Sequence, residues 1–424
     1  MLVSVKKIGV LALLCAFLGS ANADQNGNRN VPEAAPLHPD FATLFSRTLT
    51  LDKVPGGVYA IVHRNQIVEM NAFGVRERNG TTPVDEHTVF RIASVSKTFA
   101  GTLAVMLAEQ GQLDLSDPVS QYVPELKFKN PQFNNGLKVQ HLLAHSSGVV
   151  PNAYDNLIEA DYPRERILPH FNRINPMCSP GACYGYQNVL FSLVEDVITQ
   201  RTGETYQNLV DSLIFQPLTM NDASIGLQGY LASENRASAH IRGRNGWYPR
   251  EVNANYYRYP AAAGVNASAN DLANWLIAHM GFQSDVLPAP VLDTIRTPRV
   301  RTTRDLRRRN WRPLLSDAHY GLGWRVYEIK DKTLMYHGGW VEGFRAEISY
   351  SPDYDVGLVI LINAESTAMN GLSPYFWREV LPRMETEQWV PYQYANRVQP
   401  LPTPLRKPEQ SVSFPFNLCY SCLL

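Results

Sequence analysis

Features that mark several other classes of protein are scarce or absent in this sequence. The 39 lysines and arginines balance the 39 aspartates and glutamates, so the formal net charge is zero and nucleic acid is not an expected partner. After the first residues, no apolar run is long enough to cross a bilayer as a helix. The chain also lacks a Gly-x-Ser-x-Gly turn, which argues against an ordinary α/β-hydrolase.

Cysteine is rare, with five residues in a chain of 424. Cys15 lies in an N-terminal apolar segment, and the others form two close pairs, Cys178 with Cys183 and Cys419 with Cys422. In an exported protein an even number of cysteines indicates disulfides, and the short spacings favour bonds within each pair. A zinc site built from both pairs is the alternative.

The N-terminus has the pattern of a secretory signal. Lys6 and Lys7 precede an apolar run from Ile8 to Leu18, and Ala21-Asn22-Ala23 forms a small-x-small cleavage site. We therefore expect a signal peptide over residues 1–23 and a mature protein that is exported, either to the periplasm or out of the cell. We expect a flexible lead-in over residues 24–40, one enzyme-sized domain over residues 41–385, and a C-terminal tail over residues 386–424.

Strand-like segments occur toward both ends of this domain, and helices occupy its middle. Strands are predicted at Gly57–Arg64, Ile67–Phe73, Gly323–Ile329, Thr333–His337, Phe344–Tyr350 and Gly357–Ile362, and helices at Phe99–Gln110, Val139–Ala144, Asn188–Arg201 and Ala269–Met280. Short turns and a glycine-rich link at Gly338–Gly343 would join the last four strands into an antiparallel meander. We therefore predict an α+β fold, in which the N- and C-terminal segments share one antiparallel sheet flanked by helices. A mostly helical domain would be inserted between them.

The first candidate site is Ser94-Val95-Ser96-Lys97, directly before a predicted helix. Residues three apart lie on one helix face, so Lys97 can take the proton of the Ser94 hydroxyl if burial keeps the amine neutral. The same spacing occurs at Ser4 and Lys7, but that copy would be lost with the signal peptide.

A Tyr-x-Asn triplet can relay a proton and hydrogen-bond a substrate. The chain contains four, beginning at Tyr154, Tyr186, Tyr206 and Tyr394. Only Tyr186 follows a Pro-Gly turn and directly precedes an amphipathic helix, a junction where side chains reach a cleft. We therefore select Tyr186 and Asn188.

Histidines stand at two further places of interest. His337-Gly338-Gly339 ends a predicted strand, where glycines permit close approach of a ligand. A histidine there carries partial charge near neutral pH or hydrogen-bonds a substrate carboxylate. His145 lies one turn after His141, but no third ligand and no His-Glu-x-x-His motif accompany them, so we assign His145 a structural role in its loop.

Taken in order, Ser-x-x-Lys at Ser94, Tyr-x-Asn at Tyr186 and His-x-Gly at His337 resemble the motifs of the serine β-lactamase and penicillin-binding protein superfamily. The class C β-lactamase-like branch, with its D,D-peptidases, D-aminopeptidases and esterases, is the most similar. Further landmarks of this branch are Phe90-Arg91-Ile92-Ala93, Leu142-Leu143-Ala144-His145-Ser146-Ser147-Gly148, Pro217-Leu218-Thr219-Met220, Ala263-Gly264, Asp271-Leu272-Ala273, Tyr320-Gly321-Leu322-Gly323-Trp324 and Gly343-Phe344. The resemblance runs from about Phe41 to about Pro382, but the Ser-Asp-Asn and Lys-Thr-Gly motifs of class A enzymes are absent.

This resemblance implies a role for each matched residue. Ser94 would be the acylated nucleophile, and Lys97 the amine that accepts its proton. Tyr186 would work with Lys97 as general base and acid, and Asn188 would bind the substrate carbonyl and orient Lys97. The family implies neither a metal nor an organic cofactor.

The resemblance also concerns the substrate. The backbone N–H groups of Ser94 and of Trp340, which follows Gly339, would hold the oxyanion. His337 stands where many relatives have lysine, and Gly338 where they have a hydroxyl, which argues against an efficient β-lactamase.

We therefore expect a serine hydrolase that forms an acyl-enzyme on amide, lactam or ester bonds. Its type would be that of a D,D-peptidase or penicillin-binding enzyme, with a small molecule or a peptide such as a peptidoglycan peptide as substrate. A class C-type β-lactamase or an esterase is the alternative within this chemistry. A non-catalytic penicillin-recognising or envelope scaffold protein is the alternative from another class.

One segment has a strong composition bias, with eight arginines between Arg296 and Arg312. Such a segment is usually a solvated loop or helix face. The alternative is an electrostatic contact with an anionic surface or substrate.

Overall fold

The structure is a computed structural model, and it describes residues 40–386. The predicted signal peptide, nearly all of the lead-in and tail, and the pair Cys419 and Cys422 lie outside the described residues. Within the described residues, the first helix begins at Phe41 and the last ends at Glu385.

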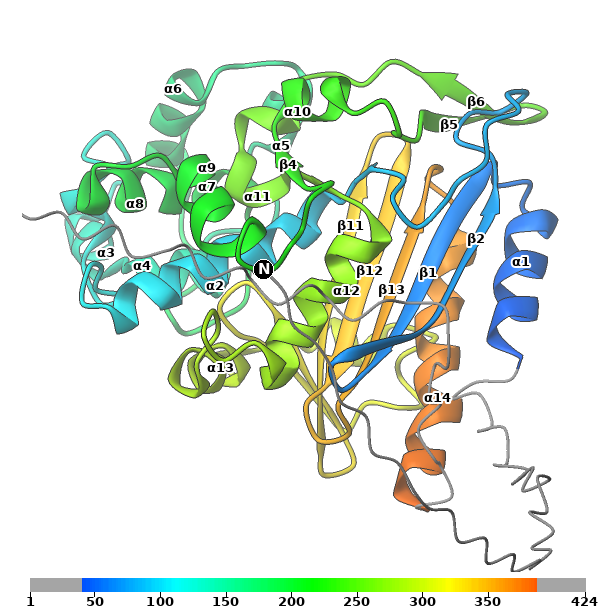
Figure 1. Cartoon of the computed structure of the whole chain (residues 1–424). Coiled ribbons are helices and arrows are strands. Elements are labelled where there is room, and N and C mark those ends of the chain that lie inside the picture. The colour runs from blue at the N-terminus through cyan, green and yellow to red at the C-terminus, as the bar shows by residue number, and fades with distance from the viewer. Residues whose placement is uncertain (1–39, 387–424) are drawn as a thin grey trace, which may run out of the picture.

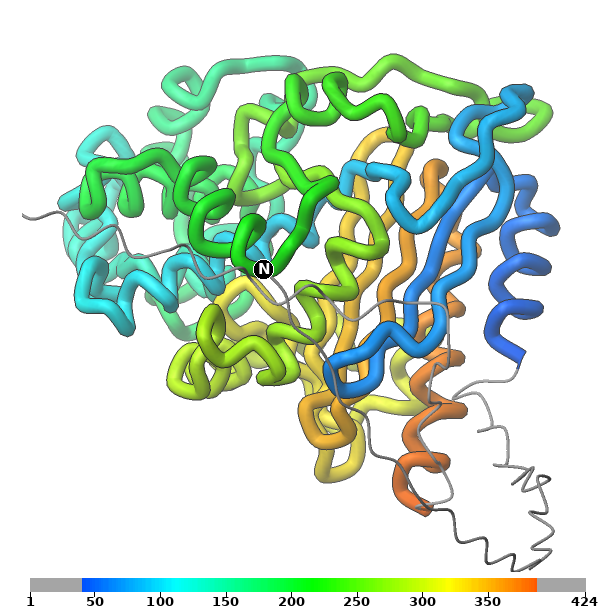
Figure 2. Tube along the Cα trace, viewed as in Figure 1, coloured from blue at the N-terminus to red at the C-terminus, as the bar shows by residue number. Residues whose placement is uncertain are grey.

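Strands from both ends of the chain form one sheet. The strands are β1 (Gly56–His63), β2 (Gln66–Gly74), β3 (Phe90–Arg91), β4 (Ser224–Ile225), β5 (Ala239–Gly243), β6 (Gly246–Arg250), β7 (Val265–Ala267), β8 (Val300–Arg301), β9 (Asp317–Tyr320), β10 (Arg325–Ile329), β11 (Lys332–Val341), β12 (Phe344–Ser351) and β13 (Val356–Ile362). In the described part of the chain, eight of them pair antiparallel in the order β2-β1-β13-β12-β11-β10-β9-β8. Figure 2 shows the blue N-terminal hairpin beside the orange C-terminal strands.

Helices fill the stretch between the two parts of the sheet and flank it. They are α1 (Phe41–Leu51), α2 (Ser96–Glu109), α3 (Pro131–Gly136), α4 (Val139–Leu143), α5 (Asp155–Glu159), α6 (Arg164–Ile167), α7 (Asn188–Ser192), α8 (Val194–Thr202), α9 (Tyr206–Val210), α10 (Leu227–Ala232), α11 (Pro260–Ala263), α12 (Ala269–Ile277), α13 (Ala289–Arg296) and α14 (Leu372–Glu385). Helices α3 to α9 gather at one side of the molecule, away from the sheet (Figure 1). The predicted α+β architecture with a shared sheet and an inserted helical part is therefore confirmed.

Apolar side chains cover both faces of the sheet, which explains why β1 and β13 are buried along their whole lengths. On one face, Val58 belongs to a core that includes Leu272 of α12. On the other face, Tyr59 packs with Phe41 of α1, whose ring also contacts Phe376 of α14. Each fully buried side chain of this size contributes roughly 1.5–3 kcal/mol. The sheet therefore separates two hydrophobic cores, one on each of its faces.

The glycine-rich link predicted at Gly338–Gly343 is wrong, because β11 continues through these glycines to Val341. Pairing with β12 extends the strand, with Gly338 opposite Glu347 and Gly339 opposite Ala346. The turn itself is short and ends at Gly343, whose φ of 83° is left-handed and suits glycine.

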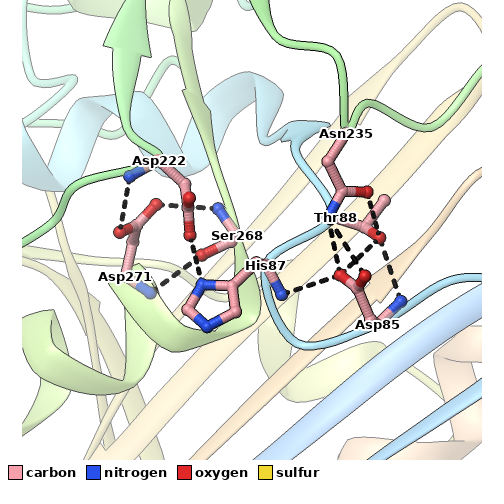
Figure 3. Close-up of polar contacts among 7 residues, drawn as sticks. All are labelled: Asp85, His87, Thr88, Asp222, Asn235, Ser268 and Asp271. Carbon is pink, nitrogen blue, oxygen red and sulfur yellow. Dashed lines mark hydrogen bonds and ion pairs between the residues drawn. The ribbon is translucent and has the colours of Figure 1, made fainter.

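A chain of polar contacts fixes the segment that leads into β3 (Figure 3). Asp85 accepts the backbone N–H of His87 at 3.0 Å, and the His87 ring contacts Asp222 at 2.8 Å. The Asp222 backbone donates to Asp271 at 3.3 Å, and Asp271 forms a capping box with Ser268 at the start of α12. These contacts anchor the approach to Ser94 on a helix of the core.

Among residues 40–386, no helix combines the length and the apolar character needed to cross a membrane.

Candidate active site

Ser94 lies in a tight turn between the sheet and the central helix. A 3₁₀ turn, η1 (Ala93–Val95), joins β3 to α2, which begins at Ser96, three residues earlier than predicted. Ala93 has a φ of 51°, an unusual value for a residue with a side chain. Strain of this kind costs on the order of 1–3 kcal/mol and often marks a functional site. Ser94 lines a cavity of about 860 Å³, a size typical of ligand sites.

The Lys97 side chain is completely buried and directed at Ser94. Its Nζ lies 3.3 Å from Ser94 Oγ, 2.7 Å from Asn188 Oδ1 and 2.8 Å from the carbonyl oxygen of Ala262. A neutral amine has two N–H donors and one lone pair. Asn188 and Ala262 take both donors, so the lone pair faces the Ser94 hydroxyl and can accept its proton.

Burial lowers the pKa of Lys97 from 10.5 to about 7. This value includes two smaller effects: the Asp155 charge raises the pKa, and the Arg325 charge lowers it. About half of the molecules therefore carry a neutral amine at pH 7.

Tyr186 completes the contact set around Ser94. Its hydroxyl donates to Ser94 Oγ at 2.8 Å. Burial raises the pKa of Tyr186 well above its ordinary value, so the side chain is a phenol rather than a phenolate at neutral pH. The His145 ring packs against Tyr186 with 4.1 Å between centroids, and the backbone N–H of Gln187 donates to His145 Nδ1 at 3.2 Å. His145 therefore positions Tyr186, in line with the structural role predicted for it.

Asn188 connects Lys97 to a carboxylate that sequence reasoning missed. Its Nδ2 donates to Asp155 Oδ2 at 2.8 Å, while its Oδ1 accepts from Lys97. Burial raises the pKa of Asp155 to about 6. Asp155 starts the short helix α5, directly after Tyr154 in the left-handed conformation. No local pattern distinguishes it from a surface acid.

A second missed support lies behind Ala262. The neighbouring Ala261 N–H donates to Glu195 at 2.8 Å, and desolvation of the half-buried Glu195 side chain raises its pKa to about 8. This contact holds the backbone turn whose carbonyl receives Lys97. The landmark Ala263-Gly264 was the one sequence signal close to this turn.

His337 lies near the site but does not line the cavity. Its Nε2 is 2.8 Å from the Tyr320 hydroxyl, and its side chain is 1% exposed. Burial, with the charges of Arg325 and Lys97, lowers the pKa of His337 well below 6.5. The expectation of a partly charged ring near neutral pH is therefore wrong, and the assignment of His337 as a substrate-binding residue stays a prediction.

Gly339 brings β11 against the Ser94 turn. A Cβ atom at Gly339 would lie 2.1 Å from the carbonyl oxygen of Ile92 and 3.2 Å from Ala93 Cβ, so only glycine permits this approach. The next residue, Trp340, is 65% exposed, and its indole N–H donates to Glu365 at 2.6 Å. Trp340 directly follows Gly339, the residue that contacts the Ser94 turn. The oxyanion role expected for the backbone N–H of Trp340 stays a prediction.

The cavity wall also contains the disulfide. Cys178 and Cys183 are bonded at 2.04 Å, which confirms the predicted pair and excludes the zinc alternative for these two residues. Cys183 lines the cavity next to Tyr184. In the described part of the chain, no group of three or more His, Cys, Asp or Glu side chains is arranged to hold a metal ion.

Comparisons with known proteins agree with this geometry. A family model named Beta-lactamase matches residues 41–380. A β-lactamase of Yersinia enterocolitica is 26% identical over 360 residues, which cover 76% of this chain and 86% of the relative. A β-lactamase of Escherichia coli strain K12 is 23% identical over 386 residues, which cover 82% and 93%.

A solved structure shares the fold. The octameric penicillin-binding protein homologue from Pyrococcus abyssi superimposes with a TM-score of 0.71 at 22% identity, over 81% of this chain and 77% of the other. The family model spans most of this chain, from the first helix to near the end of the last. The protein therefore belongs to the β-lactamase family.

Proposed function

We propose that the protein is a serine hydrolase that forms an acyl-enzyme on Ser94. The observation that carries this proposal is the position of Ser94 Oγ, 3.3 Å from the Nζ atom of a buried lysine and 2.8 Å from the Tyr186 hydroxyl. Neutral Lys97 takes the Ser94 proton as Oγ attacks the substrate carbonyl carbon. The backbone N–H groups of Ser94 and Trp340 are the proposed donors to the oxyanion.

The remaining proton steps use the same side chains. When the tetrahedral intermediate collapses, the bond from the carbonyl carbon to the leaving nitrogen or oxygen breaks, and the leaving atom takes the Tyr186 phenol proton. The proton held by Lys97 then restores the phenol. Water next adds to the acyl carbonyl carbon and gives a proton to Lys97. The bond from that carbon to Ser94 Oγ then breaks, Lys97 returns the proton to Oγ, and the acid product leaves. Asn188 and Asp155 hold Lys97 in place throughout.

Within this chemistry we propose a D,D-peptidase or penicillin-binding type of activity. The neutral His337 ring and the absence of a hydroxyl at Gly338 leave this part of the site without the cation and hydroxyl expected of an efficient β-lactamase. A cavity of about 860 Å³ has room for a peptide. A β-lactamase activity is the second candidate, supported by two relatives of that name at 23–26% identity.

We further propose that residues 41–385 form the hydrolase domain and that the protein is exported. The match to residues 41–380 and the limits of the first and last helices support the domain. A disulfide between Cys178 and Cys183 supports an oxidising compartment.

The test is a turnover panel with the purified protein. A peptide ending in D-Ala-D-Ala, a chromogenic cephalosporin and a neutral nitrophenyl ester are compared for wild type, Ser94→Ala and Tyr186→Phe. We expect hydrolysis of the peptide to exceed that of the cephalosporin. Ser94→Ala should abolish turnover, and Tyr186→Phe should reduce it about 10²–10⁴-fold. Turnover that survives in both variants contradicts the mechanism, and wild-type protein without turnover of any substrate favours the non-catalytic alternative.

A further inference from the structure

The arginine-rich segment noted in the sequence forms part of the cavity wall. Arg301, Arg304 and Arg308 of this segment line the same cavity as Ser94, and Arg325 and Arg345 join them from β10 and β12. The segment is therefore not only a solvated loop. Its guanidinium groups lie within the space that a substrate acylating Ser94 would occupy.

These five arginines are only partly neutralised. The cavity lining contains two carboxylates, Asp305 and Glu347. Arg325 pairs with Asp305 at 2.5 Å, and Arg301 pairs outside the lining with an aspartate of β9 at 2.8 Å. Within residues 40–386, Arg304, Arg308 and Arg345 form no ion pair with a carboxylate. The cavity therefore keeps an excess of positive charge.

An unpaired edge of β11 explains why these arginines line the same cavity as Ser94. Strand β10 begins at Arg325, opposite Tyr336, so the part of β11 after Tyr336 has no partner from β10. Gly338 and Gly339 lie on this open stretch and line the cavity without side chains. Because Gly338 is opposite Glu347, the cavity extends from the Ser94 turn past the glycines to side chains of β12.

Buried groups at this end of the cavity have unused hydrogen-bonding capacity. Arg345 Nε and Glu347 Oε2 are buried, and neither atom forms a hydrogen bond in the described part of the chain. Arg345 is held by Asn370 at 2.7 Å, and Arg308 by the Tyr327 hydroxyl at 3.2 Å. Burial raises the pKa of the Glu347 carboxyl, while the charges of Arg345 and Arg308 lower it. Buried polar atoms in proteins are nearly always hydrogen-bonded, so these two atoms are available to a water molecule or a ligand.

We propose that Arg304, Arg308 and Arg345 form a subsite for an anionic group of the substrate, at a distance from the bond that Ser94 attacks. None of the three forms a hydrogen bond with Lys97, Tyr186 or Ser94, so the role that we propose for them is to select the substrate. Guanidinium groups bind carboxylates and phosphates through paired hydrogen bonds, and a cavity with this excess charge concentrates anions. This inference rests on the proposed function, because it assigns specificity to the same cavity.

Matched esters test the subsite in turnover. The 4-nitrophenyl monoester of adipate and the 4-nitrophenyl ester of 5-phosphonopentanoate are compared with 4-nitrophenyl hexanoate, which has a neutral acyl chain of similar length. On the leaving-group side, 3-(hexanoyloxy)benzoate is compared with the corresponding benzamide. We expect kcat/KM to favour the anion in at least one pair by about tenfold or more, and this preference to fall as salt is added. The carboxylate and phosphonate arms distinguish the two anion types.

Variants connect the preference to the named residues. Arg304→Gln, Arg308→Gln and Arg345→Gln should each lower the ratio of anionic to neutral kcat/KM several-fold. Arg309→Gln is the matched control, because Arg309 is exposed like Arg304 and belongs to the same segment but does not line the cavity. Equal kcat/KM within every pair overturns the proposal, as does a loss of preference in Arg309→Gln equal to that in the other variants.

A binding measurement keeps the inference separate from the proposed function. The Ser94→Ala variant is titrated with adipate and with inorganic phosphate by calorimetry. The double variant, which carries Ser94→Ala and Arg308→Gln, is titrated in the same way. Saturable binding that is lost with Arg308→Gln supports the subsite even if no ester is turned over. Turnover that depends on Ser94 without any anion preference, together with no binding, overturns the subsite and leaves the proposed function intact.

Discussion

Replacing Asp155 by asparagine tests how the protein keeps Lys97 available as a base. A lysine with the ordinary pKa of 10.5 would be neutral in about 0.03% of molecules at pH 7. The pKa of about 7 given by burial raises this population more than a thousandfold, to about half. The negative charge of Asp155 favours protonated Lys97, so it opposes part of this effect. Asparagine removes the charge and still offers an acceptor to Asn188.

The assay is the pH profile of kcat/KM for a neutral ester between pH 5 and 9. Wild-type activity should rise with pH to a plateau, with a midpoint near 7. In Asp155→Asn the midpoint should move to lower pH, because Lys97 then loses its proton more easily. The pKa of Asp155 is about 6, so its charge is present across most of this range. One opposite charge two hydrogen bonds away is worth on the order of 1 pH unit.

The control is Asp285→Asn, which removes an exposed carboxylate that does not line the cavity and should leave the midpoint unchanged. A midpoint in Asp155→Asn that stays in place or moves to higher pH would refute the reasoning about Lys97.

Three further substitutions test other parts of the structure. The folded pKa of Glu195, about 8, exceeds its ordinary 4.5, so the folded state binds more protons between these values and stability falls as pH rises through them. In Glu195→Gln, the free energy of unfolding measured by urea denaturation should fall less with pH than in wild type, a difference on the order of a few kcal/mol at pH 9. The same pH dependence in both proteins contradicts the raised pKa of Glu195. Cys178→Ser opens the disulfide and should cost about 2 kcal/mol of unfolding free energy, a loss that a reductant should reproduce in wild type. Gly339→Ala places a carbon 2.1 Å from the Ile92 carbonyl oxygen and should cost about 1–3 kcal/mol and most of the activity. Gly136→Ala, whose nearest new contact is 3.9 Å away, is the control, and equal effects of the two would be inconsistent with a tight approach at Gly339.

The parts of the site that depend on local spacing could be predicted from the sequence. Ser94 and Lys97 are three residues apart, and this spacing places both side chains on one side of the turn, where Nζ lies 3.3 Å from Oγ. Tyr186 was selected among four Tyr-x-Asn triplets by its turn and the helix that follows it, and the structure brings it to Ser94. The apolar runs of β1 and β13 likewise indicated strands of one shared sheet, and in the structure these two strands pair with each other although they lie far apart in the sequence.

The supporting groups could not be predicted, because tertiary packing alone brings them to the site. Asp155 and the Ala262 carbonyl reach Lys97 from loops with no common sequence pattern. The neutral state of His337 follows from its burial beside Tyr320 of β9, a strand that the sequence pattern did not indicate. The glycines at 338 and 339 resembled a turn, because the pairing that keeps them in a strand is set by β12.

The sequence also did not predict which arginines line the cavity. A run of basic residues is most often a solvated surface, and the local pattern of Arg304 and Arg308 does not differ from that of Arg309. Only the open edge of β11 brings some members of the segment to the cavity and leaves others in solvent.

The central claim is that Ser94 becomes acylated, and intact-protein mass spectrometry tests it most directly. Wild-type protein is mixed with penicillin or with a peptide ending in D-Ala-D-Ala, quenched in acid during turnover, and digested to locate the modified peptide. We predict a mass increase equal to the acyl group on the peptide that contains Ser94, and no increase in Ser94→Ala. Turnover without an adduct at Ser94, or an adduct that persists elsewhere in Ser94→Ala together with full activity, would contradict the account.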